Sequence, residues 1–61
     1  MDELLKEEEV AEIVKLGIST LRNMRHNQKG LPYVKLGRAV RYRRSDVEQY
    51  INDHMVAVDS L

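Results

Sequence analysis

The chain has 61 residues, no cysteine and two histidines, and its ten Lys or Arg residues balance its ten Asp or Glu residues. This length predicts one small domain, too short for a catalytic domain with an ordinary substrate pocket. The composition excludes a disulfide framework and a thiolate metal site, and no apolar stretch approaches the roughly 18 residues that a membrane helix needs.

The first predicted helix covers about residues 6–15. Its apolar residues recur at helical spacing and form one stripe: Val10, Ala11, Ile13 and Val14. The glutamates Glu7 to Glu9 fall in its first turn, where the helix dipole favours negative charge. No Ser, Thr, Asp or Asn stands in place to cap this helix, so the sequence does not fix its first residue.

A second helix is predicted from residue 17 or 18 to about residue 28, because Leu16-Gly17 interrupts the first pattern. Its inward residues are Ile18, Leu21 and Met24. Its other face is polar, and we expect these side chains to point outward: Ser19, Arg22, Asn23, Arg25 and His26. Gly30 follows in the place where a helix C-terminus usually has glycine.

Residues 31–36 and 39–42 have the composition of two short strands around a turn at Gly37-Arg38. Pro32 stands at the start of the first strand, where a missing N–H is tolerated. The third helix is predicted from a capping box, Ser45 to Glu48, with Ser45 as the cap. Its apolar face would hold Val47, Tyr50, Ile51 and Met55, with Met24 and Met55 filling the core. The predicted single domain has its core at about residues 5–55, and residues 56–61 carry no clear pattern.

Charge is distributed unevenly along the chain. Residues 15–44 contain nine Lys or Arg and no Asp or Glu, whereas residues 1–14 carry a net charge of −5 and residues 45–61 one of −4. A block of one sign in a folded domain attracts polyanions. Nucleic-acid binding is therefore the first hypothesis, ahead of a merely solvated basic surface.

The order helix, turn, helix, hairpin, helix is that of a winged helix-turn-helix, and a plain three-helix bundle is the alternative. Such motifs need a small residue where the second helix crosses the first, and Ala11 stands in that place. The apolar positions at fixed offsets from it are filled as well, by Val10, Val14, Leu16, Leu21 and Met24. The predicted fold class is thus mainly α with a small β-hairpin.

Four segments allow a closer comparison: Glu9-Val10-Ala11-Glu12-Ile13, Thr20-Leu21-Arg22, Leu31-Pro32-Tyr33-Val34-Lys35-Leu36-Gly37-Arg38, and Arg41-Tyr42 followed by Asp46-Val47. On these residues the chain resembles, from about residue 5 to residue 51, the excisionase-type and AlpA-like winged helix-turn-helix domains related to MerR regulators. The resemblance implies that the second helix enters the major groove of DNA and that the hairpin is a wing on the backbone or in the minor groove. It implies no ligand sensing, since we expect neither the effector domain nor the dimerisation helix of full-length MerR regulators. Many relatives have glycine where this chain has Lys15, so either Lys15 adopts a positive φ or Gly17 takes over the turn.

Six residues of the second helix are candidate DNA contacts: Ser19, Thr20, Arg22, Asn23, Arg25 and His26. Arginine can bond guanine O6 and N7 in a bidentate fashion, which suits Arg22 and Arg25, and Asn23 has the amide geometry for adenine. Hydroxyls in the first turn suit phosphate contacts beside the helix N–H groups. For His26, a DNA contact and an idle surface position are both open.

Five residues of the hairpin are candidate wing contacts: Lys35, Gly37, Arg38, Arg41 and Arg43. Gly37 permits a tight turn, which would place Lys35 and Arg38 at its tip. The other two arginines continue the basic strip along the second strand. A narrow, A·T-rich minor groove would attract such a wing arginine.

We therefore expect a cytoplasmic, sequence-specific binder of double-stranded DNA from a phage or mobile element, acting as an excisionase or an AlpA-like transcription regulator; the acidic start, Met1-Asp2-Glu3, is unlike a signal peptide. A single small module implies cooperative self-association on DNA, or a partner such as an integrase or other recombinase. We expect no membrane, metal, cofactor or small-molecule ligand. Ser19 and His26 lack an orienting carboxylate in the basic block, which argues against an enzyme. Two other classes remain open: an architectural DNA-docking factor for packaging or partition, and a protein-interaction module such as an antirepressor or antitoxin.

Overall fold

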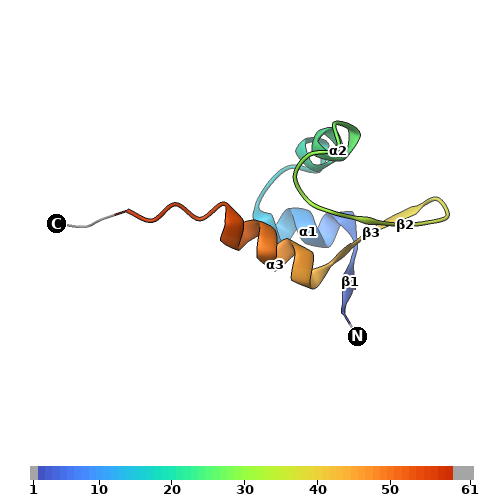
Figure 1. Ribbon diagram of the computed structural model, residues 1–61. Helices are drawn as coiled ribbons and strands as arrows, with labels where there is room; N and C mark the ends of the chain where they lie inside the picture. The colour runs from blue at the N-terminus through green and yellow to red at the C-terminus, as the bar shows by residue number, and fades with distance from the viewer. Residues whose placement is uncertain (1, 59–61) are drawn as a thin grey trace.

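The computed structural model describes residues 2–58, in which three helices pack around a small antiparallel sheet (Figure 1). The elements in chain order are β1 (Leu4–Leu5), α1 (Glu7–Val14), α2 (Ile18–His26), β2 (Val34–Leu36), β3 (Ala39–Arg43) and α3 (Arg44–Asp53). The β2–β3 hairpin projects from the body on the side opposite the C-terminal segment (Figure 1). This arrangement is the predicted winged helix-turn-helix, and the plain three-helix bundle is wrong.

The sheet has the strand order β1-β3-β2, and β3 is antiparallel to both neighbours. In the hairpin Leu36 pairs with Ala39, and Gly37 turns the chain with a φ of 63°. At the other edge of β3, Leu5 of β1 pairs with Tyr42. The sequence analysis did not predict β1, because two residues are too few to show a periodicity.

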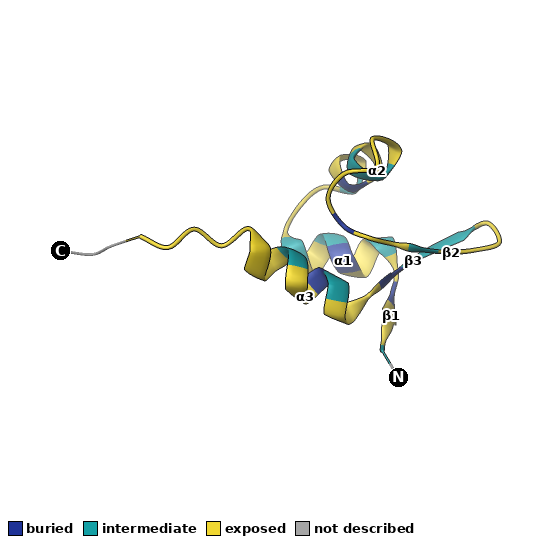
Figure 2. Cartoon of the chain, in the orientation of Figure 1, coloured by how far each residue is buried: buried dark blue, intermediate teal, exposed yellow. Residues whose placement is uncertain are grey.

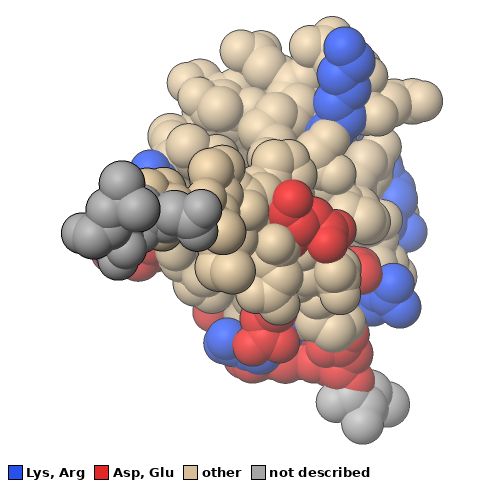
Figure 3. All heavy atoms as spheres, turned by 60° about the vertical axis from the view of Figure 1, so that its left-hand side comes forward, with Lys and Arg blue, Asp and Glu red and all other residues tan. Residues whose placement is uncertain are grey.

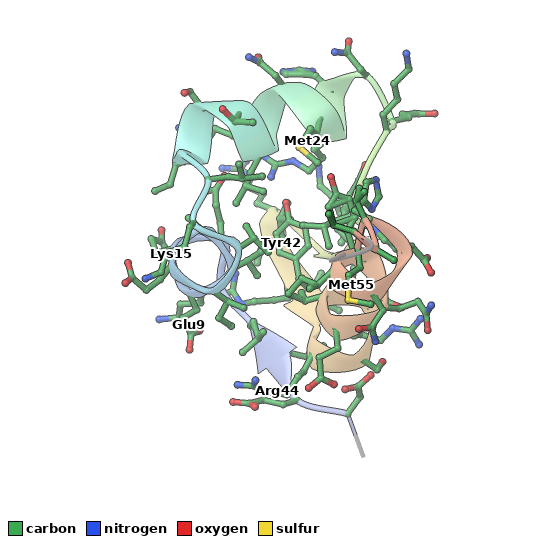
Figure 4. The ribbon with its side chains drawn as sticks, turned by 90° about the vertical axis from the view of Figure 1, so that its left-hand side faces the viewer. Glu9, Lys15, Met24, Tyr42, Arg44 and Met55 are labelled. Carbon is green, nitrogen blue, oxygen red and sulfur yellow. The ribbon has the colours of Figure 1, made fainter. Side chains whose placement is uncertain are left out.

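Six buried residues form the core: Leu5, Val10, Leu21, Leu31, Tyr42 and Val47. Five of them come from the elements other than β2, and Leu31 comes from the loop after α2; Figure 2 shows these buried segments in dark blue. Tyr42 lies in the middle of the helices, and Met24 lies on the side of α2 that faces the body (Figure 4). Burying one large apolar side chain stabilises a fold by roughly 1.5–3 kcal/mol, so these residues hold α2 and the wing to one body. Ile13 of the predicted apolar stripe is exposed instead.

The turn between α1 and α2 depends on Lys15, which has a φ of 58° and a ψ of 38°. Its backbone N–H donates to the carbonyl of Ala11, as does the N–H of Leu16. Gly17 has an ordinary φ of −70° at the start of α2. Of the two alternatives, Lys15 therefore adopts the left-handed conformation, and the start of α2 does not slide.

Helix α2 ends at His26, two residues before its predicted end. Gln28 and Gly30 both have positive φ in the loop that follows, at 54° and 81°. A Cβ on Gly30 would lie 2.2 Å from Cε of Met24 and 3.4 Å from its Cβ. The end of the Met24 side chain could move away from such a Cβ, so the positive φ of Gly30 is what favours glycine at this position.

The predicted capping box of α3 is wrong. The helix begins at Arg44, with Arg43 at the N-cap, so Ser45 already lies in the first turn. The chain start supplies the missing acceptors: the N–H of Arg44 donates to the carbonyl of Glu3 over 2.9 Å, and both the N–H and the hydroxyl of Ser45 donate to the carboxylate of Asp2. The Ser45 hydrogen bond also holds the pKa of Asp2 below its ordinary value. Residues 2 and 3, brought close by β1, thus accept the hydrogen bonds at the start of α3 that the local capping box was expected to provide.

The predicted apolar face of α3 is only half right. Val47 is buried and Tyr50 packs against the core, but Ile51 is exposed. Met55 lies beyond the end of the helix and its side chain is 75% exposed, so it does not fill the core (Figure 4). Residues 56–58 continue away from the body without a helix or strand (Figure 1).

Candidate nucleic-acid interface

A concave surface lies between α1, α2 and the wing. Its larger part, a groove of about 490 Å³, is lined by Lys6, Glu7, Glu8, Arg22, Arg25, Arg38, Ala39, Val40 and Arg41. A second hollow of about 390 Å³ lies toward the end of α2 and is lined by Arg25, His26, Gln28, Tyr33, Lys35, Arg38 and Val40. Since Arg25, Arg38 and Val40 line both, the two hollows adjoin, and they bring Arg22, Arg25 and His26 of α2 into one region with the wing. Three predicted contacts of α2 line neither hollow: Ser19, Thr20 and Asn23.

Five of the six candidate residues on α2 are exposed as predicted: Ser19, Thr20, Arg22, Asn23 and His26. The first two are in the first turn of the helix, where free backbone N–H groups face solvent. Asn23 has an exposed amide one residue after Arg22. Together they give α2 a polar face that can bond both phosphates and base edges.

Arg25 is the exception, because its side chain points inward rather than outward. Its Nη1 donates to the hydroxyl of Tyr42 over 3.2 Å and lies 3.5 Å from Oε1 of Glu7. Its guanidinium carbon is 6.0 Å from the centre of the Tyr33 ring. The hydrogen bond to Tyr42 raises the pKa of Arg25. Residue 25 is four positions after the buried Leu21 and so lies on the same helix face, which makes Arg25 a link between α2 and β3.

Arg22 is exposed but paired. Its Nε and Nη2 donate to the two carboxylate oxygens of Glu7 over 2.9 and 3.1 Å. This hydrogen bond is the main reason that the pKa of Glu7 lies below its ordinary value. Glu7 is therefore ionised at neutral pH, and the stability that this pair adds is lost only as the pH falls through the lowered pKa. From the sequence alone, Glu7 was predicted only to favour the helix dipole, because a partner 15 residues away leaves no local pattern.

The wing carries three exposed or half-exposed cations, Lys35, Arg38 and Arg41. Lys35 pairs with Val40 across the hairpin, and Arg38 follows Gly37 in the turn. Arg41 donates a hydrogen bond to the carbonyl of Val40 over 2.8 Å. The predicted tip residues thus lie at the outer end of the hairpin.

Arg43 does not belong to this group. It is at the base of the hairpin, where it pairs with Leu4 of β1 and ends β3. Its Nε and Nη2 donate to the carboxylate of Asp46 over 2.8 and 3.2 Å. Because the next helix begins directly after it, Arg43 orders the junction of β3 and α3 and is a poor candidate for a wing contact.

Ion pairs reduce the free positive charge of the basic block. Among residues 2–58, five of its nine cations lie within salt-bridge distance of an acid: Lys15, Arg22, Arg25, Arg43 and Arg44. The remaining four have no ion pair in the described part of the chain: Lys29, Lys35, Arg38 and Arg41. They lie after α2 and on the wing. The molecule seen from the side of its C-terminal segment is largely uncharged, with most Lys and Arg atoms near the margin (Figure 3).

Residues 2–58 contain no cluster of three or more His, Cys, Asp or Glu side chains suited to a metal ion. Within the same range, no helix combines the length and the apolar character that crossing a membrane requires.

A family model described as a helix-turn-helix domain matches residues 4–55. The match covers most of the chain, from β1 through α3. No curated protein and no solved structure gives a significant match. The residues matched by the family model contain the paired helices, the wing and the polar face of α2. The chain accordingly belongs to the helix-turn-helix domain family as a small DNA-binding protein.

Proposed function

We propose that the protein binds double-stranded DNA sequence-specifically, with α2 in the major groove and the wing on the backbone or in the minor groove. The observation that carries this proposal is the shared concave surface, in which Arg22 and His26 from the polar face of α2 adjoin the unpaired cations of the wing. Phosphate contacts from the wing and the first turn of α2 fix orientation, and side chains such as Asn23 read bases. His26 lines the hollow near the wing and is a further candidate contact.

Its biological role in this proposal is that of an excisionase of a phage or other mobile element, or of an AlpA-like transcription regulator. Both roles need a compact DNA-binding module that acts with other molecules. One module of this kind makes an interface of roughly 600–1,000 Å² of protein surface. Useful specificity then requires several copies on adjacent sites, or a partner such as an integrase.

Alanine at Asn23 and at Arg38 should separate base reading from clamping. Asn23→Ala is expected to cost about 1–3 kcal/mol on the preferred site and to relax the base preference at one position, because the amide reads a base edge. Arg38→Ala is expected to weaken all sequences more evenly, because it contacts phosphates. The measurement is selection of bound sequences from a random DNA pool, followed by affinity titrations of the selected and a scrambled duplex.

Asn52→Ala is the matched control, since it removes an exposed amide from α3 rather than from the polar face of α2. It should leave both affinity and preference unchanged. An unchanged preference profile for Asn23→Ala would argue against α2 as the reading helix. A loss of A·T preference in Arg38→Ala would instead assign the wing to an A·T-rich minor groove.

We further propose cooperative binding of two or more copies to direct repeats by a protein that is monomeric without DNA. A head-to-tail contact is heterologous and places each copy in the same orientation, so repeats rather than palindromes are expected. In this proposal the acidic flanks, residues 1–14 and 45–61, contact the basic block of a neighbouring copy. Four acids are already in ion pairs within the chain: Glu3, Glu7, Glu12 and Asp46. Asp2, Glu9 and Asp53 accept hydrogen bonds from neighbouring groups. Among residues 2–58 this leaves Glu8 and Glu48 as the acids for that contact.

Cooperativity is measured by titrating the protein on DNA that carries one site and on DNA that carries two sites at helical spacing. The per-site affinity should be higher on the two-site DNA, and sedimentation of the free protein should give a monomer. Equal per-site affinities, or a stable dimer in the absence of DNA, would favour an isologous dimer on a palindrome.

A further inference from the structure

A chain of hydrogen bonds and ion pairs runs from the buried core to the exposed end of Arg22. The hydroxyl of Tyr42 accepts from Nη1 of Arg25, and the same nitrogen lies 3.5 Å from Oε1 of Glu7. Glu7 in turn holds Arg22 through both of its carboxylate oxygens. The side chain of Glu7 is 14% exposed, whereas that of Arg22 is 58% exposed. The link therefore fixes a flexible surface side chain to a rigid part of the fold.

The geometry of this pair leaves one edge of the Arg22 guanidinium free. A guanidinium has five N–H donors in a rigid plane. Glu7 uses the side edge, made of Nε and one hydrogen of Nη2. Both hydrogens of Nη1 and the second hydrogen of Nη2 remain, and among the hydrogen bonds of residues 2–58 none uses Nη1 of Arg22. The two parallel hydrogens of this end edge match the O6 and N7 acceptors of guanine.

We propose that Glu7 is a positioning residue that orients Arg22, so that its free end edge reads one guanine in the major groove. This inference rests on the proposed entry of α2 into the major groove and adds the base that α2 reads and the residue that sets the geometry. A side chain held in place before binding loses little freedom when it meets the base. Glu7 is itself an acid at a surface that meets phosphates, so it lowers affinity for any DNA while it raises the preference for guanine.

These two effects give Glu7→Ala a distinctive result. Affinity for random duplex DNA should rise, because one negative charge is removed from the interface. The preference for guanine over other bases at one position should fall by about 2- to 12-fold, which corresponds to the cost of immobilising one flexible side chain. A residue that only repels DNA would give the first effect without the second.

Three further single substitutions and one double variant make the test specific. Glu12→Ala removes the same charge from α1 and breaks the exposed pair with Lys15, so it should leave the guanine preference unchanged. Glu7→Gln keeps one acceptor oxygen for Arg22 and should retain part of the preference, even if Glu7→Ala is poorly folded. Arg22→Lys lacks the planar donor pair and should lose the preference, and adding Glu7→Ala to it should then change the preference no further.

The measurements are base preference from a random DNA pool and affinity for matched duplexes that differ at the selected guanine, with circular dichroism to check folding. If Arg22→Lys and Arg22→Ala leave the preference profile unchanged, the proposed reading by Arg22 fails and Glu7 has nothing to orient. If they remove the guanine preference but Glu7→Ala does not, only the positioning role is overturned. If Glu7→Ala increases affinity for the guanine site more than for random DNA, Glu7 restrains Arg22 instead of orienting it, which also overturns the proposal.

Discussion

Replacing Leu21 with alanine is expected to leave much of the protein unfolded at 25 °C. Leu21 is 1% exposed and is the fully buried residue of α2, so it anchors that helix to the core. Loss of a buried leucine side chain costs about 2–5 kcal/mol. A single core in a domain below about 70 residues rarely supplies more than about 3–5 kcal/mol. The helical circular dichroism signal and a urea titration measure the effect.

Leu36→Ala is the matched control for this experiment. It removes the same side chain from the wing, where Leu36 is 52% exposed. Its urea midpoint should stay close to that of the unchanged protein, within about 0.5 kcal/mol of unfolding free energy. A cooperative transition at the unchanged midpoint for Leu21→Ala would show that α2 is not anchored through this residue.

Raising the salt concentration from 50 to 200 mM is expected to weaken DNA binding by roughly 250- to 1,000-fold. The unpaired cations lie after α2 and on the wing, and the N–H groups of α2 add to them. If about four to six phosphates are neutralised, the log–log slope of affinity against salt should be about −4 to −5. Anisotropy titrations of a labelled duplex at several salt concentrations give this slope directly.

Single substitutions calibrate the same slope. Arg38→Ala should make it less steep by about one, because one phosphate contact is lost. Lys15→Ala should leave it unchanged, because Lys15 pairs with Glu12 and does not line the concave surface. An affinity that does not vary with salt would contradict phosphate binding at this surface.

Local sequence patterns predicted most of the fold because its helices and hairpin have local signals. The apolar spacing around Val10 and Leu21 located α1 and α2, and the Gly37-Arg38 pair located the turn of the wing. The resemblance narrowed the turn between α1 and α2 to Lys15 or Gly17, and the structure gives the positive φ to Lys15. Each of these features depends on residues within a few positions of one another.

The errors arose where distant residues decide the outcome. Ser45 stands in a local sequence typical of a helix N-cap. The free N–H groups at the start of α3 are nevertheless bonded by Asp2 and Glu3, more than 40 residues away in the chain. Arg25 has the sequence of a surface residue, yet the hydroxyl of Tyr42 draws it inward. The free positive charge of residues 15–44 is lower than their composition suggests, for the same reason. Three arginines of this block pair with acids that precede the block in the chain. No local pattern encodes such partners.

The closure of the fold by its first residues has a consequence for how the domain folds. Strand β1 adds to β3, and the contacts of Asp2 and Glu3 with the start of α3 join residues 41 to 43 positions apart. Contacts of such separation form late, because the chain must first lose the entropy of closing a long loop. During synthesis Leu5 therefore cannot pair with Tyr42 until β3 has been synthesised. The core cannot form before β3 and the first turn of α3 are present. Helix α2 is synthesised early, but it is held in place only when nearly the whole domain is present.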